Sequence, residues 1–176
     1  GIILNTRPKK SAHAYRQVWT EEGSPLAVIT RRQADAMQLR LGEQVTVDWA
    51  MRYGNPAIGE RLKAMKQAGC DRILLAPLYP QYSGATTATA NDAAFAALAK
   101  MRWQPAVRTL PPYHDDPAYI GALRRSIEGA ITALSFRPDA LLASFHGMPE
   151  RTLKLGDPYH CHSVKPARLL GEALSI

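Results

Sequence analysis

The sequence predicts an α/β fold, a doubly wound parallel sheet with helices on both faces. Short apolar runs typical of buried strands alternate along the 176 residues with longer segments of helical periodicity. Neither an internal repeat nor a low-complexity segment interrupts this alternation. Strands buried on both faces are characteristic of parallel sheets whose connections are helices.

The first part of the chain contains two helical segments and a strand. Residues 8–22 are compatible with a helix, and the turn Gly23-Ser24-Pro25 ends it. A second helix is expected over residues 30–41, with a threonine as its N-cap and a glycine as its stop. Alternating apolar and polar residues over 45–51 predict the first strand.

The middle of the chain continues the alternation. Asn55-Pro56 has the pattern of an N-cap followed by proline at the first helical position, which predicts a helix that ends at Gly69. The apolar run 73–78 predicts a second strand, the alanine-rich segment 88–101 a helix, and residues 106–110 a third strand.

The last third of the chain shows the same patterns of helix starts and apolar runs. Asp116-Pro117 predicts the start of a helix, and capping also accounts for the acidic pair Asp115-Asp116 beside His114. Its apolar stripe consists of Ile120, Leu123, Ile127, Ile131 and Leu134. The run 141–146 predicts a fourth, buried parallel strand, and a helix closes the chain.

Composition narrows the class of protein. The chain is 46% hydrophobic with a net charge of +7, and no apolar run approaches the roughly 20 residues of a membrane span. Its basic residues are scattered without interleaved aromatic residues, which disfavours nucleic acid as a partner but leaves peripheral contact with anionic lipid open. Cys70 and Cys161 are too few for a disulfide framework and indicate a reducing, cytoplasmic compartment.

One histidine lies where an α/β sheet binds its ligands. The fourth predicted strand ends in Ser144-Phe145-His146-Gly147, and the glycine lets the backbone turn at once. Ligands of open α/β sheets bind at the carboxyl ends of the strands. An imidazole, with an ordinary pKa of about 6.5, can transfer a proton or bind a metal there. A structural histidine satisfied by a backbone carbonyl is the open alternative.

Two other loops follow predicted strands. Residues 79–87 are dense in aromatic and hydroxyl groups, which suits a large, flat, partly polar ligand, although an ordinary surface loop has the same composition. Arg52 could meet a carboxylate or pair on the surface. His160-Cys161-His162 has no second cluster to complete a closed zinc site.

Several motifs, in this order along the chain, resemble ferrochelatases. The strongest are Leu78-Tyr79-Pro80-Gln81-Tyr82-Ser83 with Thr86-Thr87, Ser144-Phe145-His146-Gly147-Met148-Pro149, and Lys154-Leu155-Gly156-Asp157-Pro158-Tyr159. Also similar to that family are Arg7-Pro8-Lys9-Lys10-Ser11 with Tyr15, Gly23-Ser24-Pro25-Leu26, and Arg52-Tyr53-Gly54-Asn55-Pro56. The resemblance runs nearly end to end and implies a class II chelatase-like, flavodoxin-like half.

The resemblance implies a reaction and a set of site residues. The reaction is insertion of Fe²⁺ into protoporphyrin IX to give protohaem, the last step of haem biosynthesis, with no cofactor beyond the substrate metal. His146 is implied as proton acceptor or metal ligand, acting with a glutamate. The porphyrin pocket is implied to contain Tyr15, Arg16, Ser24, Tyr79, Gln81, Tyr82, Ser83, Thr86 and Thr87. An iron–sulfur cluster stays an open question.

The chain also departs from the family pattern. Residues 1–176 are expected to form an incomplete chelatase: most of the N-terminal α/β domain plus the linking helix, without the second α/β domain and its glutamate. A pocket with one wall predicts that this polypeptide alone is inactive. Ser163 and Pro166 replace the Cys and Thr of many relatives, and a proline near the start of that helix is tolerable.

Three other functions are compatible with the sequence. A cobalt chelatase acting on a sirohydrochlorin-type ring would share the fold and the histidine, but its more carboxylated substrate calls for more arginines at the pocket. The other two are a non-catalytic porphyrin-binding module and a plain α/β interaction domain. Metal preference stays open, because iron, zinc and cobalt(II) all accept imidazole.

Overall fold

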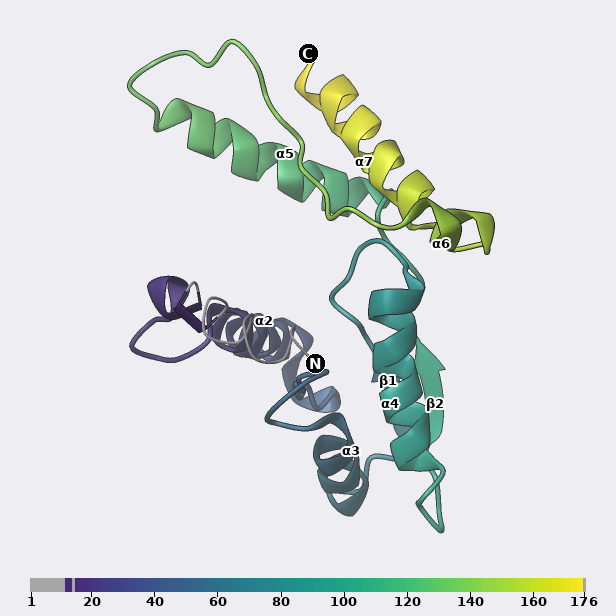
Figure 1. Cartoon of the computed structure of the whole chain (residues 1–176). Coiled ribbons are helices and arrows are strands. Elements are labelled where there is room, and N and C mark those ends of the chain that lie inside the picture. The colour runs from purple at the N-terminus through teal and green to yellow at the C-terminus, as the bar shows by residue number, and fades with distance from the viewer. Residues whose placement is uncertain (1–11, 14, 176) are drawn as a thin grey trace. The chain divides into compact units, whose positions relative to one another are not determined.

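The computed structural model describes residues 12–13 and 15–175, in two compact units, Gly1–Gly69 and Cys70–Ile176 (Figure 1). In the first unit, residues 12–13 and 15–18 are helical, within the helix predicted over 8–22. The other elements of this unit are helix α2 (Pro25–Leu41), the 3₁₀ turn η1 (Gly42–Gln44) and helix α3 (Ile58–Gln67).

Helix α2 begins earlier than the sequence predicted. Ser24 is its N-cap and Pro25 its first residue, where the fixed φ of proline suits a helix start. Thr30, the expected N-cap, lies inside the helix, and its hydroxyl donates to the Leu26 carbonyl at 2.7 Å.

The strand predicted over residues 45–51 is wrong. Only Met51 makes a bridge, to Ala57. The Gln38 side chain explains the difference, because its amide nitrogen donates to the Val45 carbonyl at 2.9 Å and its oxygen accepts from Val47 N at 2.7 Å. Backbone groups that a strand would offer to a neighbouring strand are therefore satisfied by a side chain of α2.

The predicted start of helix α3 is also wrong. Ala57, not Asn55, occupies its N-cap, and the Pro56 carbonyl accepts from Met51 N at 2.8 Å. An ion pair between Asp48 and Arg61, with the Nη2–Oδ2 distance at 2.6 Å, ties the irregular segment before Met51 to α3.

The second unit contains a small parallel sheet. Strands β1 (Arg72–Leu75) and β2 (Ala106–Thr109) pair in register, Ile73 opposite Val107. Between them run the π-helical turn η2 (Gly84–Ala88) and helix α4 (Thr89–Leu98), which buries Ala94 and Leu98. This β–α–β unit confirms an α/β class, whereas the doubly wound arrangement is not seen in the described residues.

Three helices complete this unit: α5 (Pro117–Thr132), α6 (Glu150–Lys154) and α7 (Tyr159–Leu174). Asp116 caps α5 as predicted, accepting from Ala118 N at 2.8 Å. Helices α5 and α7 pack together and bury Ile120 and Leu170 (Figure 1). The predicted stripe of α5 holds along its first turns, but Ile131 and Leu134 are 37% and 44% exposed.

The predicted fourth strand is wrong. Residues 138–149 form an irregular loop between α5 and α6, and residues 141–147 are exposed, Leu142 to 91% (Figure 1). A strand needs a neighbour to take its backbone hydrogen bonds, and in the described chain this segment pairs with neither β1 nor β2.

Two further features complete the fold. Pro166 lies inside α7 rather than near its start, so the His162 carbonyl lacks its usual helical donor. Among the described helices, none combines the length and apolar character needed to cross a bilayer.

Candidate functional site

The loop of residues 79–87, here called the candidate loop, is held by the carboxylate of Asp157. Asp157 Oδ2 accepts from Ser83 Oγ at 2.9 Å and from Gly84 N at 2.8 Å. Its other oxygen accepts from Tyr159 N at 3.0 Å, in the first turn of α7. A Cβ at Gly84 would lie 3.4 Å from Oδ2, so glycine suits this close approach. One side chain therefore joins the loop to the helix.

Ser83 and Thr87 are the buried residues of the candidate loop. Ser83 is 1% exposed, and its hydroxyl also accepts from Ala85 N at 3.1 Å, which caps the π-helical turn. Thr87 is 5% exposed, and the hydroxyls of Thr86 and Thr87 have no hydrogen-bond partner among the described residues. Gln81 and Tyr82 are half-buried and Tyr79 is exposed. The aromatic and amide groups are therefore the accessible ones.

A pair of stacked histidines forms the second attachment of the candidate loop. His162 Nδ1 accepts from the backbone N–H of Tyr82 at 3.1 Å. The His162 ring stacks on His114 with centroids 3.8 Å apart and planes 16° from parallel. Asp115, next to His114, pairs with Lys165 of α7. The segment before α5, the candidate loop and α7 therefore meet at this pair.

The charges at this junction follow from burial and hydrogen bonding. Burial lowers the pKa of His114 and of His162, and the neighbouring His114 lowers that of His162 further. Burial alone would raise the pKa of Asp157, but hydrogen bonds from Gly84, Tyr159 and Ser83 outweigh it and lower the pKa. Near neutral pH the junction therefore contains neutral imidazoles and an ionised carboxylate.

The surroundings of His146 differ from those of the two stacked histidines. It is exposed within the irregular loop before α6, and no hydrogen bond joins it to another described residue. Across the described chain, no three histidine, cysteine, aspartate or glutamate side chains gather as a metal site would require.

The other three predicted porphyrin residues belong to the unit Gly1–Gly69. Tyr15 is 61% exposed and makes an edge-to-face contact with Trp19, with ring centroids 6.4 Å apart. Arg16 is exposed. Ser24 caps α2 by position, without a side-chain hydrogen bond. In the same unit, the guanidinium carbon of Arg52 lies 4.5 Å from the centre of the Tyr53 ring, a cation–π contact.

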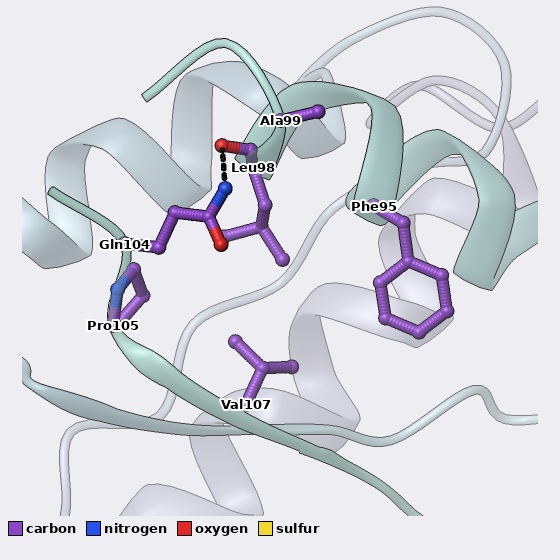
Figure 2. Close-up of a pocket in the computed structure, with 6 residues that line it drawn as sticks. All are labelled: Phe95, Leu98, Ala99, Gln104, Pro105 and Val107. Carbon is purple, nitrogen blue, oxygen red and sulfur yellow. Dashed lines mark hydrogen bonds between the residues drawn. The ribbon is translucent and has the colours of Figure 1, made fainter. Parts of the chain in front are cut away.

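A separate pocket of about 330 Å³ lies between α4 and β2. Figure 2 shows it lined by Phe95, Leu98, Ala99, Gln104, Pro105 and Val107. Gln104 Nε2 donates to the Leu98 carbonyl at 2.9 Å, which ties the segment before β2 to the end of α4. None of the predicted site residues lines this pocket.

The residues that hold the candidate loop were not predicted from the sequence. Asp157, His162 and His114 were not assigned to it. A signal was present for the first of them, because Asp157-Pro158 repeats the Asp116-Pro117 pattern of a helix start. No local pattern joins Tyr82 to His162, which are 80 residues apart.

Comparison with known proteins gives one consistent result. The model of the ferrochelatase family matches residues 1–176. The ferrochelatases of Rhizobium etli and Rhizobium meliloti are both 56% identical to the chain, over 100% and 99% of its length and 52% of their own. That of an Azoarcus species is 52% identical over 100% of the chain and 49% of its own length. The chain spans about half the length of these relatives.

Proposed function

This chain belongs to the ferrochelatase family, and we propose that it takes part in inserting Fe²⁺ into protoporphyrin IX to give protohaem. The observation that carries the proposal is the extent of the match, because the family model and relatives above 50% identity cover the chain from end to end. Protoporphyrin IX and ferrous iron are then the substrates. The two free cysteines fit a reducing compartment, and we place the reaction in the cytoplasm.

The reaction makes three physical demands. Two pyrrole N–H protons must leave, the metal must lose bound water, and the planar ring must bend so that a nitrogen lone pair faces the metal. We assign His146 to the first or second demand, since a neutral imidazole accepts a proton or binds a metal. Its exposure in the described chain supports this role, because a substrate can reach the ring.

We assign porphyrin binding to the candidate loop together with Tyr15, Arg16 and Ser24. Within the loop, the accessible Tyr79, Gln81 and Tyr82 would contact the ring and its polar edge. The buried Ser83 and Thr87, with Thr86 beside them, would maintain the shape of the loop.

We also propose that the chain is most of an N-terminal α/β domain with its linking helix, and that turnover needs the half of the relatives that it does not span. The 52% coverage of the Rhizobium relatives supports this division. A pocket between two domains would otherwise lack one wall.

The test compares the 176-residue chain with a chimaera in which it replaces the matching half of the Rhizobium etli protein. Zinc insertion into a soluble porphyrin is followed by fluorescence. The chimaera is expected to turn over and the chain alone is not. His146→Ala in the chimaera is expected to abolish turnover, whereas His160→Ala, a matched change at an exposed histidine, leaves it intact.

Each contrary result refutes one part of the proposal. Metal insertion by the chain alone would refute the incomplete-domain assignment. Full activity of the His146→Ala chimaera would refute the role of that histidine. A shifted porphyrin Soret band without metal insertion would identify a porphyrin-binding module in place of an enzyme.

A further inference from the structure

The backbone of the candidate loop is held at two closely spaced points by groups at the start of α7. Tyr82 N donates to His162 Nδ1 at 3.1 Å, and Gly84 N donates to Asp157 Oδ2 at 2.8 Å. The first acceptor gains a proton within the range of pH in which histidines titrate, whereas the second remains ionised there. The two attachments therefore respond differently to acid.

We propose that His162 is a pH-sensitive positioning residue, which fixes the backbone of Tyr82 when its ring is neutral and releases it when its ring is protonated. The proposal rests on the proposed function insofar as the candidate loop contacts the porphyrin. His162 acts through Tyr82 and is not assigned a contact with the substrate.

The hydrogen bond dictates the tautomer of His162. Nδ1 accepts from Tyr82 N only when it carries no proton, so the ring proton must be on Nε2. Protonation places an N–H at Nδ1, directly opposite the N–H of Tyr82. The acceptor is then lost and two donors face each other. Gly84 keeps its own acceptor on Asp157, so the adjoining turn stays attached.

Charged groups from each neighbouring element act on the His162 ring. From the segment before α5, His114 stacks at 3.8 Å and Asp115 adds a negative charge. From α7 and its cap, Lys165 adds a positive charge and Asp157 a negative one. Burial, His114 and Lys165 disfavour protonation, and the two carboxylates favour it. Burial is the largest of these effects and lowers the pKa of His162, so release is expected at pH values below those of an exposed histidine.

The test is amide hydrogen exchange of Tyr82 in the full 176-residue chain, measured relative to Gly84 from pH 7.5 to about pH 4, because the pKa of His162 is lowered and that of Asp157 is lowered as well. The ratio cancels the intrinsic pH dependence of exchange. The protection of Tyr82 relative to Gly84 is expected to fall about fivefold on acidification, the effect of losing one backbone hydrogen bond. An unchanged ratio would overturn the proposal.

Variants separate the imidazole from its surroundings. In His162→Asn the amide oxygen can take the place of Nδ1 without titrating, so the ratio is expected to stay constant with pH. His160→Asn, two residues earlier in the same helix, is expected to retain the fall seen in the unmodified chain. A fall in His162→Asn equal to that of the unmodified chain would refute the role of His162.

A second measurement covers the case in which His162→Asn does not fold. The ¹⁵N shifts of the His162 ring in the unmodified chain are expected to report the Nε2–H tautomer near neutrality, and to titrate together with the amide shift of Tyr82. Independent titration of the two signals would overturn the proposal.

Neither measurement needs metal insertion, so an inactive chimaera would refute the proposed function and leave the result on His162 standing. In an active chimaera, acidification is expected to raise the KM for porphyrin, and His162→Asn to remove this rise with little change in kcat. A KM that rises equally in both proteins would exclude any effect of His162 on substrate binding.

Discussion

Asp157 shows how much of a site one carboxylate can organise. Its Oδ2 binds a hydroxyl and a backbone N–H of the candidate loop, and its Oδ1 binds the first turn of α7. Each bond has an ionised acceptor, and such bonds are shorter and stronger than those between neutral groups. The position of the loop therefore depends on the charge as well as on the shape of this side chain.

Replacing Asp157 with Asn keeps the shape and removes the charge. One side-chain oxygen becomes an NH₂ group facing the donors of Ser83 or Tyr159, so at least one hydrogen bond is lost. We expect Asp157→Asn to lower the free energy of unfolding by about 2 kcal/mol, measured by urea denaturation. Glu150→Gln is the control, because the pair it makes with Lys154 is exposed and contributes at most about 0.5 kcal/mol. Equal effects of the two substitutions would contradict this account.

Among the elements, the start of α5 was predicted correctly, whereas the predicted starts of α2 and α3 were not. Asp116 of α5 accepts from two backbone N–H groups, as the Asp-Pro pattern indicated. At α2 the residue is a serine and its side chain makes no capping bond. The N-cap side chain is therefore expected to stabilise α5 more than α2.

This difference can be measured with two alanine substitutions. Asp116→Ala should destabilise the chain by about 1 kcal/mol, because two N–H groups of α5 lose their acceptor. Ser24→Ala should change stability by less than about 0.5 kcal/mol, because no capping bond is removed. Urea denaturation followed by far-ultraviolet circular dichroism gives both values. A larger cost for Ser24→Ala would show that the capping geometry is not as described.

The strands were harder to predict than the helices for a physical reason. A helix satisfies its backbone within one segment, so its caps and its periodicity are local signals. A strand depends on a neighbouring strand for its backbone hydrogen bonds, and the local sequence does not show which segment that neighbour is. Residues 73–75 and 106–109 have such a neighbour. In the segment 45–50, Val45 and Val47 bond to the Gln38 side chain instead, and residues 141–146 pair with no other described strand. Apolar character predicted burial, and burial was not found for Leu142.

In the candidate site, too, local features were predicted from the sequence and contacts between distant segments were not. Composition pointed to residues 79–87 as a loop suited to a ligand, and capping patterns accounted for Asp116. What the sequence could not indicate was the junction of Tyr82, His162 and His114, because stacking and hydrogen bonds between distant segments leave no periodic trace.

Because residues 141–147 are exposed, substitutions there are expected to have little effect on stability. Leu142 is 91% exposed and Leu98 is 6% exposed, although both belong to apolar runs. Leu98→Ala should therefore cost about 2–5 kcal/mol, because a buried side chain leaves a cavity. Leu142→Ala should cost less than about 0.5 kcal/mol. Urea denaturation of the 176-residue chain distinguishes the two, and a cost of several kcal/mol at Leu142 would restore the predicted buried strand.

At the scale of the whole molecule, the titrating groups of the unit Cys70–Ile176 predict how stability depends on pH. Burial lowers the pKa of His114 and His162, so the unfolded chain binds more protons than the folded one below about pH 6.5. The pKa values of two carboxyl groups are also lowered. At Asp157, hydrogen bonds outweigh the effect of burial, and at Asp115 the main cause is the hydrogen bond from Lys165. Their contribution to stability is present above about pH 4 and is lost below it.

The free energy of unfolding should therefore be highest above about pH 6.5 and decrease in two stages. The first decrease runs from there down to the lowered pKa values of the histidine pair, and the second follows below about pH 4, as the carboxylates are protonated. Urea midpoints measured from pH 8 to pH 3 test both. The double variant His114→Asn, His162→Asn should lose the first decrease and keep the second, because only the carboxylates then titrate at the junction. His13→Asn, in the other unit, is the control and should retain both decreases. A first decrease that persists in the double variant would place its origin outside the histidine stack.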